Sequence, residues 1–238
     1  MDITIVGAGR AGTSFALALA RAGHSLRLIH HDQIDEVGNP DFVLICVPDD
    51  DIAAVAASIP VNDFYVVAHV SGSKGLDVLA PHDRVASLHP LMTLPTGELG
   101  ERRLVGATFC VNGDELAVAL VGSLRGRVIT LRDDQRTAYH ATATVAANHL
   151  VALMGHVDQL ARAAGLSLED FLPLARQALD DVGECGPERA LTGPASRGDM
   201  TTIDAHLAAI PESERSTYVA MANAAFELAE RRRSQSLA

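Results

Sequence analysis

Short, nearly continuous apolar runs alternate with helix-forming segments through the first half of the chain. The runs are rich in Val, Ile and Leu, which is typical of strands buried on both faces of a sheet. They lie at residues 3–6, 26–29, 42–47, 64–68, 85–88, 107–111 and 128–131. Strands that alternate with helices predict βαβ units, so we expect the α/β class with a doubly wound, mostly parallel sheet.

After residue 133 the pattern becomes helical. Residues 134–164 contain no Pro and a single Gly, which predicts one helix of about 30 residues. Further helical segments follow as far as about Arg233. We therefore expect two domains: a nucleotide-binding sheet domain over 1–133, and an all-helical substrate and dimerisation domain over 134–238.

Composition narrows the function classes. The 238 residues include 19 basic and 30 acidic side chains, and the net charge of −11 argues against nucleic acid or an anionic membrane as partner. Three widely spaced cysteines, no metal-ligand spacing and no signal or membrane-spanning segment predict a cytoplasmic protein without a metal. A small-molecule substrate is the expected partner.

A glycine-rich loop follows the first predicted strand. Gly7 permits a tight turn, Gly9 lets the backbone approach a diphosphate, and Gly12 lets the next helix pack closely on the strand. Arg10 and Ala11 complete the loop, and the helix start offers free N–H groups to phosphates. The sequence therefore predicts a Rossmann-type dinucleotide site; a glycine-rich turn without ligand is the alternative.

The end of the second strand bears on which dinucleotide binds. A carboxylate there binds the ribose diol of NAD, and Asp32 lies at about the usual spacing of ~20 residues from the loop. His30 and His31 follow the strand directly, and with Arg10 they could instead contact the 2′-phosphate of NADP. We expect NADP, with NAD as the alternative; a third interpretation leaves both histidines as exposed residues without a ligand.

Polar residues also follow later strands, where ligands of open α/β sheets bind. Val47 and Pro48 end the third strand, and we interpret the aspartates after them as caps of the next helix. After the fourth strand, the Ser71 hydroxyl and the Gly72 backbone are candidates to bind a carboxylate. His89 follows the fifth strand, and catalytic and structural roles are both open for it.

Two further motifs lie in the helical half. His140, Thr144 and Asn148 are spaced four apart among alanines, so they share one helix face and are candidates to line a site. Arg197 lies in a segment rich in Gly and Pro, where its guanidinium could bind a carboxylate in bidentate fashion. The alternative is a structural turn between Arg197 and Asp199.

Taken in order, these motifs resemble a known family, the Rossmann-like proteins that carry the C-terminal domain of unknown function 2520. Those relatives are similar to the 6-phosphogluconate and 3-hydroxyacid dehydrogenases. Besides the glycine loop, the resemblance is carried by Val47-Pro48-Asp49-Asp50, His69-Val70-Ser71-Gly72, Ser87-Leu88-His89-Pro90-Leu91, Tyr139-His140 with Asn148, and Leu191-Thr192-Gly193-Pro194 through Arg197-Gly198-Asp199.

The resemblance implies a helical domain that forms a homodimer and a site in the cleft between the domains. It also implies an NADPH-dependent reductase of a small 2-oxo acid, with ketopantoate as the favoured substrate. His140 or His89 would protonate the forming alkoxide and Asn148 would orient the carbonyl. Ser71 and Arg197 would then hold the substrate carboxylate.

One departure keeps other functions open. Hydroxyacid dehydrogenases place a lysine four residues before the asparagine, where this chain has Thr144, and the only lysine of the chain is Lys74. A protein that binds NADP(H) as a sensor without turnover is therefore one alternative. An oxidoreductase that uses coenzyme F420 is another.

Overall fold

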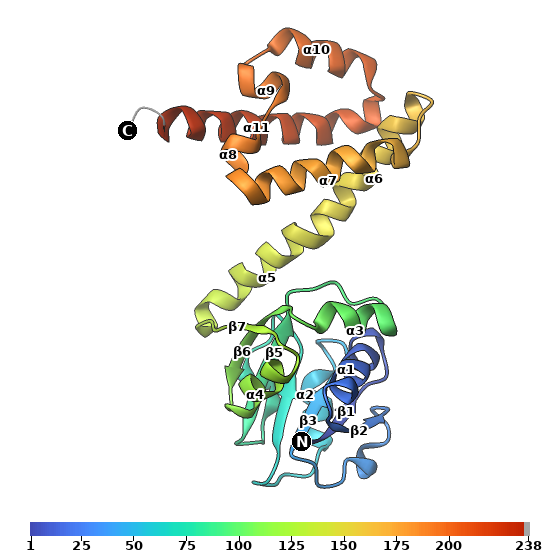
Figure 1. Ribbon diagram of the computed structural model, residues 1–238, viewed down its shortest axis with the longest axis vertical. Coiled ribbons are helices and arrows are strands. Elements are labelled where there is room, and N and C mark those ends of the chain that lie inside the picture. Colours follow the sequence, from blue (N-terminus) through green and yellow to red (C-terminus); the bar gives the residue numbers. More distant parts are fainter. Residues whose placement is uncertain (236–238) are drawn as a thin grey trace. The chain divides into compact units, whose positions relative to one another are not determined.

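The structure is a computed structural model and describes residues 1–235 (Figure 1). It divides into two compact units, Met1–Ala147 and Asn148 onward, each described by itself below. The break lies inside the long helical segment, whereas the sequence pattern placed the domain boundary at residue 133. The first turns of that segment belong with the sheet because Arg136 is buried against it.

The first unit is built on a seven-stranded sheet, and the predicted α/β class is confirmed. The strand order is β2-β1-β3-β4-β5-β6-β7, and every neighbouring pair is parallel except β5 with β6. The strands are β1 (Asp2–Val6), β2 (Ser25–Ile29), β3 (Phe42–Ile45), β4 (Val66–His69), β5 (Val85–Pro90), β6 (Thr108–Gly113) and β7 (Arg127–Ile129).

Both faces of the sheet are covered, as the continuous apolar runs predict. Alternate residues of β3 enter different cores: Phe42 and Leu44 join one cluster, and Val43 and Ile45 join the other. The helices of this unit are α1 (Arg10–Arg21), α2 (Ile52–Ser58), α3 (Glu98–Leu104), α4 (Leu116–Ser123) and α5 (Arg136–Thr144), with 3₁₀ turns at Ile34–Glu36, Leu76–Leu79 and Asp133–Gln135.

The parallel strands place several loops at one edge of the sheet. Val6 is paired with Ile45, Ile45 with His69, and His69 with Ser87. The segments that follow β1, β3 and β4 therefore leave the sheet side by side, next to the end of β5. His89 and Pro90 are the last two residues of β5, so His89 lies within the strand and not after it.

The long helical segment is not one uniform helix. α5 is followed by a π-helical turn at Val145–His149 and then by α6 (Leu150–Ala163). An i→i+5 turn holds one residue more than an α-helical turn, so the residues after it do not keep the regular spacing of four. Thr144 ends α5 and Asn148 lies in the π turn.

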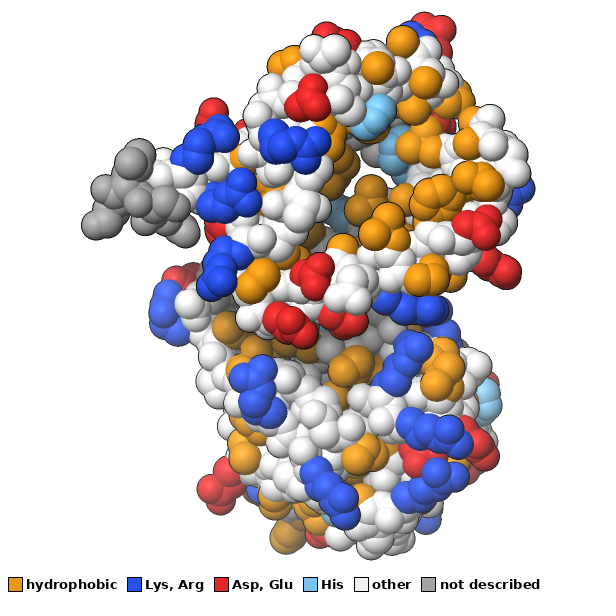
Figure 2. All heavy atoms as spheres, turned by 45° about the horizontal axis from the view of Figure 1, so that its top comes forward, with side chains coloured by type: hydrophobic (Ala, Val, Ile, Leu, Met, Phe, Trp, Pro, Cys, Tyr) orange, Lys and Arg blue, Asp and Glu red, His pale blue; other side chains and the backbone are white. Residues whose placement is uncertain are grey.

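The second unit is entirely helical in the part that the structure describes. After α6 come α7 (Leu168–Cys185), α8 (Pro187–Ala190), α9 (Gly193–Arg197), α10 (Met200–Ala209), a 3₁₀ turn (Glu212–Glu214) and α11 (Arg215–Gln235). Within residues 148–235, the buried apolar side chains are Ala161, Ala195, Ile203 and Ala229. Figure 2 shows hydrophobic side chains around a hollow in this unit.

A membrane-spanning helix is not found among residues 1–235: no helix there is both long and apolar enough to cross a bilayer.

Candidate functional site

The glycine loop has the backbone that the sequence predicts. Gly7 has a φ of +111°, and a β-carbon on it would lie 2.5 Å from the carbonyl oxygen of Cys46. A β-carbon on Gly12 would lie 1.8 Å from the carbonyl oxygen of Gly7, so α1 packs directly on the loop. Around Gly9, by contrast, a β-carbon would meet nothing within 4 Å. Only Gly9 therefore leaves open space beside the backbone.

The start of α1 suits an anion. Its first backbone hydrogen bond runs from Thr13 N to Gly9 O, at 3.0 Å, which leaves the N–H groups of the first turn without helical partners. Arg10, the first residue of α1, is exposed, and Ala11 follows it. A diphosphate fits this arrangement because the open side of Gly9, the free N–H groups and the helix dipole act on the same place.

The end of β2 carries two exposed histidines. His30 and His31 follow Ile29, and the N–H of His30 donates to the side-chain oxygen of Gln33 at 3.0 Å. Gln33 shapes this turn, and the Asp32 carboxylate accepts no hydrogen bond from residues 1–235. The carboxylate of Asp32 and the two imidazoles remain available to a ribose or a 2′-phosphate.

The loop after β3 is tied to the loop after β4. Asp49, which follows Val47 and Pro48, accepts hydrogen bonds on Oδ2 from the hydroxyls of Ser71 (2.8 Å) and Ser73 (2.6 Å). This corrects the expectation that the aspartates cap α2: Asp51 is in the N-cap position but makes no side-chain cap bond. Asp49 instead fixes two loops of the site, a role that sequence reasoning missed.

The Ser71 oxygen is fully engaged by the protein. It donates to Asp49 and accepts from the backbone N–H groups of Ser73 and Lys74, each at 3.1 Å. His69, at the end of β4, is buried and accepts from Ser71 N on Nδ1 at 3.2 Å, with Nε2 donating to Gly75 O at 3.0 Å. Burial lowers the pKa of His69. His69 is thus a neutral, structural histidine that shapes this loop.

A histidine–tyrosine–histidine cluster lies beside this loop. His89 Nδ1 and the Tyr139 hydroxyl share a hydrogen bond of 2.7 Å, with the two rings edge to face. The ring centroids of His89 and His140 are 6.2 Å apart. Gly72 fits between them: a β-carbon there would lie 2.8 Å from His89 Cε1 and 2.9 Å from His140 Nδ1. Two segments distant in sequence therefore bring both predicted histidines together.

The protonation of this cluster follows from burial. Burial, followed by the charge of His140, lowers the pKa of His89 to about 4, so His89 is neutral at neutral pH. Burial and the neighbouring Cys110 thiol raise the pKa of the Tyr139 phenol, which therefore keeps its proton. His140 Nδ1 is buried without a hydrogen-bond partner among residues 1–235. Nε2 is then the His140 nitrogen left for a ligand.

A buried arginine supports the cluster from α5. Arg136 is 4% exposed, donates to Ser87 Oγ at 3.0 Å and pairs with the exposed Asp133 at 3.3 Å. It joins α5 to β5 one turn before Tyr139 and His140. Sequence reasoning missed Arg136 because the sequence alone gives no sign that this arginine is buried.

The remaining predicted residues lie further along the chain. Thr144 is half-buried at the end of α5, and Asn148 is exposed in the π turn at the start of the second unit. Arg197 ends α9 with its side chain 64% exposed and its guanidinium 4.0 Å from Asp199. Asp199 itself caps α10 through Thr202. The Arg197 guanidinium is therefore exposed and only weakly paired with Asp199.

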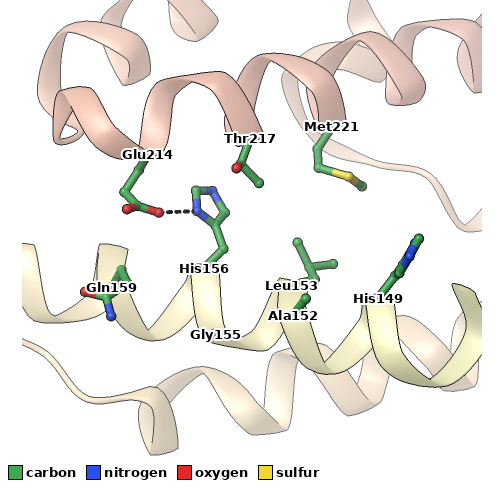
Figure 3. Close-up of a pocket in the computed structure, with 9 residues that line it drawn as sticks. All are labelled: His149, Ala152, Leu153, Gly155, His156, Gln159, Glu214, Thr217 and Met221. Carbon is green, nitrogen blue, oxygen red and sulfur yellow. Dashed lines mark hydrogen bonds and ion pairs between the residues drawn. The ribbon is translucent and has the colours of Figure 1, made fainter. Parts of the chain in front are cut away.

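The helical unit has a cavity of its own, of about 510 Å³, between α6 and α11 (Figure 3). His156 Nδ1 and Glu214 Oε2 are 2.7 Å apart at one end of it, and Met221 and Leu153 form its apolar middle. None of the predicted site residues lines this cavity. In residues 1–235 no group of three or more metal-ligating side chains is found.

A comparison with known families matches one profile, described as Domain of unknown function (DUF2520), to residues 107–225, half of the chain. No curated protein sequence matches the chain.

Solved structures match almost the whole chain. BF3122 from Bacteroides fragilis, described as a candidate NADP oxidoreductase, has a TM-score of 0.79 at 19% identity over 95% of this chain and 98% of its own. TM1727 from Thermotoga maritima has a TM-score of 0.75 at 21% identity over 97% and 99%. The NADP-bound pyrroline carboxylate reductase of Plasmodium falciparum reaches 0.63 at 11% identity over 98% of each chain. At these identities the likeness is one of fold.

Proposed function

Since the chain belongs to the family defined by the Domain of unknown function (DUF2520), we propose that it is an NADP(H)-dependent reductase of a small molecule with a C=O or C=N group. One observation carries the proposal: a glycine loop with the backbone of a dinucleotide site and a half-buried histidine–tyrosine–histidine cluster lie at the same edge of one sheet. The names of its structural neighbours, an NADP oxidoreductase candidate and an NADP-bound reductase among them, support it.

The residues that would hold the cofactor are those of the first two strand ends. Gly7, Gly9 and the N–H groups that follow would bind the diphosphate, and Arg10 with His30 would meet the 2′-phosphate. Val47 and Pro48, after β3, would border the cofactor further along the same edge. NADPH supplies a hydride to the acceptor carbon when it is bound.

The cluster would act on the proton and on the substrate's position. His140 presents Nε2 to the substrate, because its Nδ1 is packed against Gly72. His89 is neutral, so it orients the Tyr139 hydroxyl rather than donating a proton at neutral pH. Of the two histidines expected from sequence, His140 is thus the better candidate to protonate a forming alkoxide.

Ketopantoate, or another small 2-oxo acid, is the substrate proposed from the sequence motifs. Such a substrate needs a partner for its carboxylate, and the Ser71 hydroxyl already donates to Asp49. From the sequence motifs, Arg197 would bind this carboxylate and Asn148 would orient the carbonyl. The neighbours named as imine reductase and reductive aminase favour a second class, in which the acceptor is C=N.

The proposal is tested with the purified protein, first by NADPH and NADH binding and then by loss of nicotinamide absorbance. The substrate set is ketopantoate, pyruvate and the cyclic imine 2-methyl-1-pyrroline. NADPH binding with oxidation by at least one substrate is expected. Tight NADPH binding without NADPH oxidation by any substrate would favour the sensor function. Substrate reduction with reduced coenzyme F420, but not with NADPH, would favour a deazaflavin enzyme.

We also propose that the helical unit forms a homodimer. Its described part buries few apolar side chains, whereas Val151 is 70% exposed, Leu174 69% and Leu179 53%. A unit of this size with so small a core gains stability when a second copy covers its apolar surface. Sedimentation of the full chain tests this proposal, and a monomer at micromolar concentration would contradict it.

A cytoplasmic location is proposed as well, because the three cysteines are unpaired, as is usual in a reducing compartment.

A further inference from the structure

The carboxylate of Asp49 is the feature of the site that the proposed function does not yet use. Both serine hydroxyls, of Ser71 and Ser73, donate to its Oδ2. Among residues 1–235 no donor is bound to its other oxygen, Oδ1. The side chain belongs to an exposed residue at the loop edge, so a ligand can reach Oδ1. Asp49 is therefore an oriented carboxylate with one oxygen held and one oxygen free.

The charges around Asp49 leave it ionised. Burial acts to raise its pKa, but the hydrogen bonds from Ser73 and Ser71, with the charges of Lys74 and His140, together lower it below its usual range. Lys74 does not neutralise it by direct pairing, since its ammonium lies 3.3 Å from Asp50 instead.

This arrangement discriminates between ligand charges. A carboxylate placed beside Ser71 would find the hydroxyl hydrogens already donated and a like charge at Asp49. A protonated nitrogen would find the opposite: a fixed anion with a free lone pair at Oδ1. Charge and hydrogen-bond capacity thus point to the same class of ligand.

We propose that Asp49 recognises a protonated nitrogen of the substrate, so that the natural substrate is an iminium ion or a carbonyl compound bearing an amine. This inference rests on the reductase function proposed above and names its substrate class. Asp49 is then a substrate-binding residue, and Ser71 and Ser73 are positioning residues that hold its carboxylate.

The neutral state of His89 fits such a substrate. An iminium nitrogen already carries its proton when it binds, so its reduction needs no strong acid in the site. A neutral carbonyl, in contrast, needs a proton donor at the forming alkoxide, the role proposed above for His140.

The test compares Asp49→Asn with Asp50→Asn. Asparagine keeps an oxygen that can accept from the serines, and Asp50 is the neighbouring aspartate with its side chain 97% exposed. Nuclear magnetic resonance titrations of the full chain with NADP⁺ measure binding of pyrrolidine, a cation at pH 7, and tetrahydrofuran, its neutral isostere. Thermal unfolding of both variants reports whether each is folded.

We expect the wild type to bind pyrrolidinium at least about tenfold more tightly than tetrahydrofuran, since one charged hydrogen bond accounts for such a factor. Asp49→Asn should remove this preference and Asp50→Asn should keep it. In turnover, Asp49→Asn should lower reduction of 2-methyl-1-pyrroline about tenfold or more, whereas Asp50→Asn should leave it within about twofold of the wild type.

Equal binding of pyrrolidinium by wild type and a folded Asp49→Asn variant would overturn the inference. The inference on Asp49 would also be overturned if the wild type reduces ketopantoate but not the imine. In that case the proposed reductase function would still stand. Failure to bind NADPH or to oxidise it with any substrate would overturn the reductase function instead. The pyrrolidinium titration then still decides the role of Asp49. If the Asn variant is unfolded, Ser73→Ala decides: loss of this hydrogen bond to Asp49 Oδ2 should weaken the preference for pyrrolidinium, and an unchanged preference would contradict the inference.

Discussion

Gly72 lies against the ring of His89, and a β-carbon at position 72 would be only 2.8 Å from His89 Cε1. The same β-carbon would be 2.9 Å from His140 Nδ1. The absence of a side chain at Gly72 is thus what allows the two histidines to approach the loop after β4.

Gly72→Ala should therefore displace both imidazoles and lower turnover at least about tenfold, a loss of about 1.4 kcal/mol of transition-state stabilisation. NADPH binding should change less than about twofold, because the diphosphate loop is elsewhere on the sheet edge. Gly122→Ala in α4 is the matched control, since a β-carbon there meets nothing within 4 Å. Full turnover by Gly72→Ala would place the chemistry away from the histidines.

The two loop glycines should separate binding from folding. Gly9→Ala adds a methyl group on the open side of the loop, in an extended backbone that alanine can adopt, so the fold should persist. NADPH affinity should fall about tenfold or more, because the methyl group occupies the approach of the diphosphate. Calorimetric titration measures this loss, and an unchanged affinity would argue that no diphosphate binds beside Gly9.

Gly12→Ala should instead damage the fold. Its β-carbon would lie 1.8 Å from Gly7 O, a clash with backbone that cannot turn away. We expect about 3 kcal/mol of destabilisation, the cost of overpacking at a rigid contact. Urea denaturation checks this figure; a variant as stable as the wild type would mean that α1 can move from the loop without cost.

Cofactor preference should depend on Arg10, at the start of α1, and on His30, which follows β2. Arg10→Ala, alone and with His30→Ala, should weaken NADPH binding about tenfold per lost charge–phosphate contact and leave NADH binding within about twofold. Asp32→Asn should leave NADPH binding unchanged. Should NADH be the tighter ligand of the wild type, and Asp32→Asn weaken it, the site would be one for NAD.

The low pKa of His89 makes stability depend on pH. Its folded-state pKa of about 4 lies below the ordinary value of 6.5, so the unfolded chain binds this proton first as the pH falls. The stability from neutral burial is complete above pH 6.5 and is lost as the pH falls toward 4. The loss amounts to at most about 3 kcal/mol. Urea denaturation of wild type and His89→Asn from pH 7.5 to 4 should show the variant losing less stability by about that amount; parallel curves would contradict it.

The sheet could be predicted because its strands are compact apolar runs, each between turn-forming residues. Helix α3 was not predicted, since Glu98–Leu104 mixes charged and apolar residues without a clear period. The π turn at Val145–His149 was also missed, because its residues suit an α-helix equally well. Local patterns of apolar and polar residues report which side chains are buried. The π turn does not change that pattern, so the sequence gives no sign of it.

The candidate site was predictable in part. The glycine loop, His89 and His140 carry local signals, whereas the bond from Ser71 to Asp49 joins residues 22 apart on different loops. No periodicity records such a pairing, and the same holds for the contact of Arg136 with Ser87, which lies 49 residues away. What sequence reasoning missed are the long-range polar contacts that decide which side chains remain free for a ligand.

The single lysine of the chain has a practical consequence. Lys74 lies in the loop that carries Ser71 and Ser73, and its side chain is 33% exposed. Apart from the amino terminus, an amine-directed dye would therefore attach at one place only. A fluorophore on Lys74 would sit next to Ser73, whose hydroxyl donates to Asp49, so its emission could report occupancy of the site without any assay of turnover.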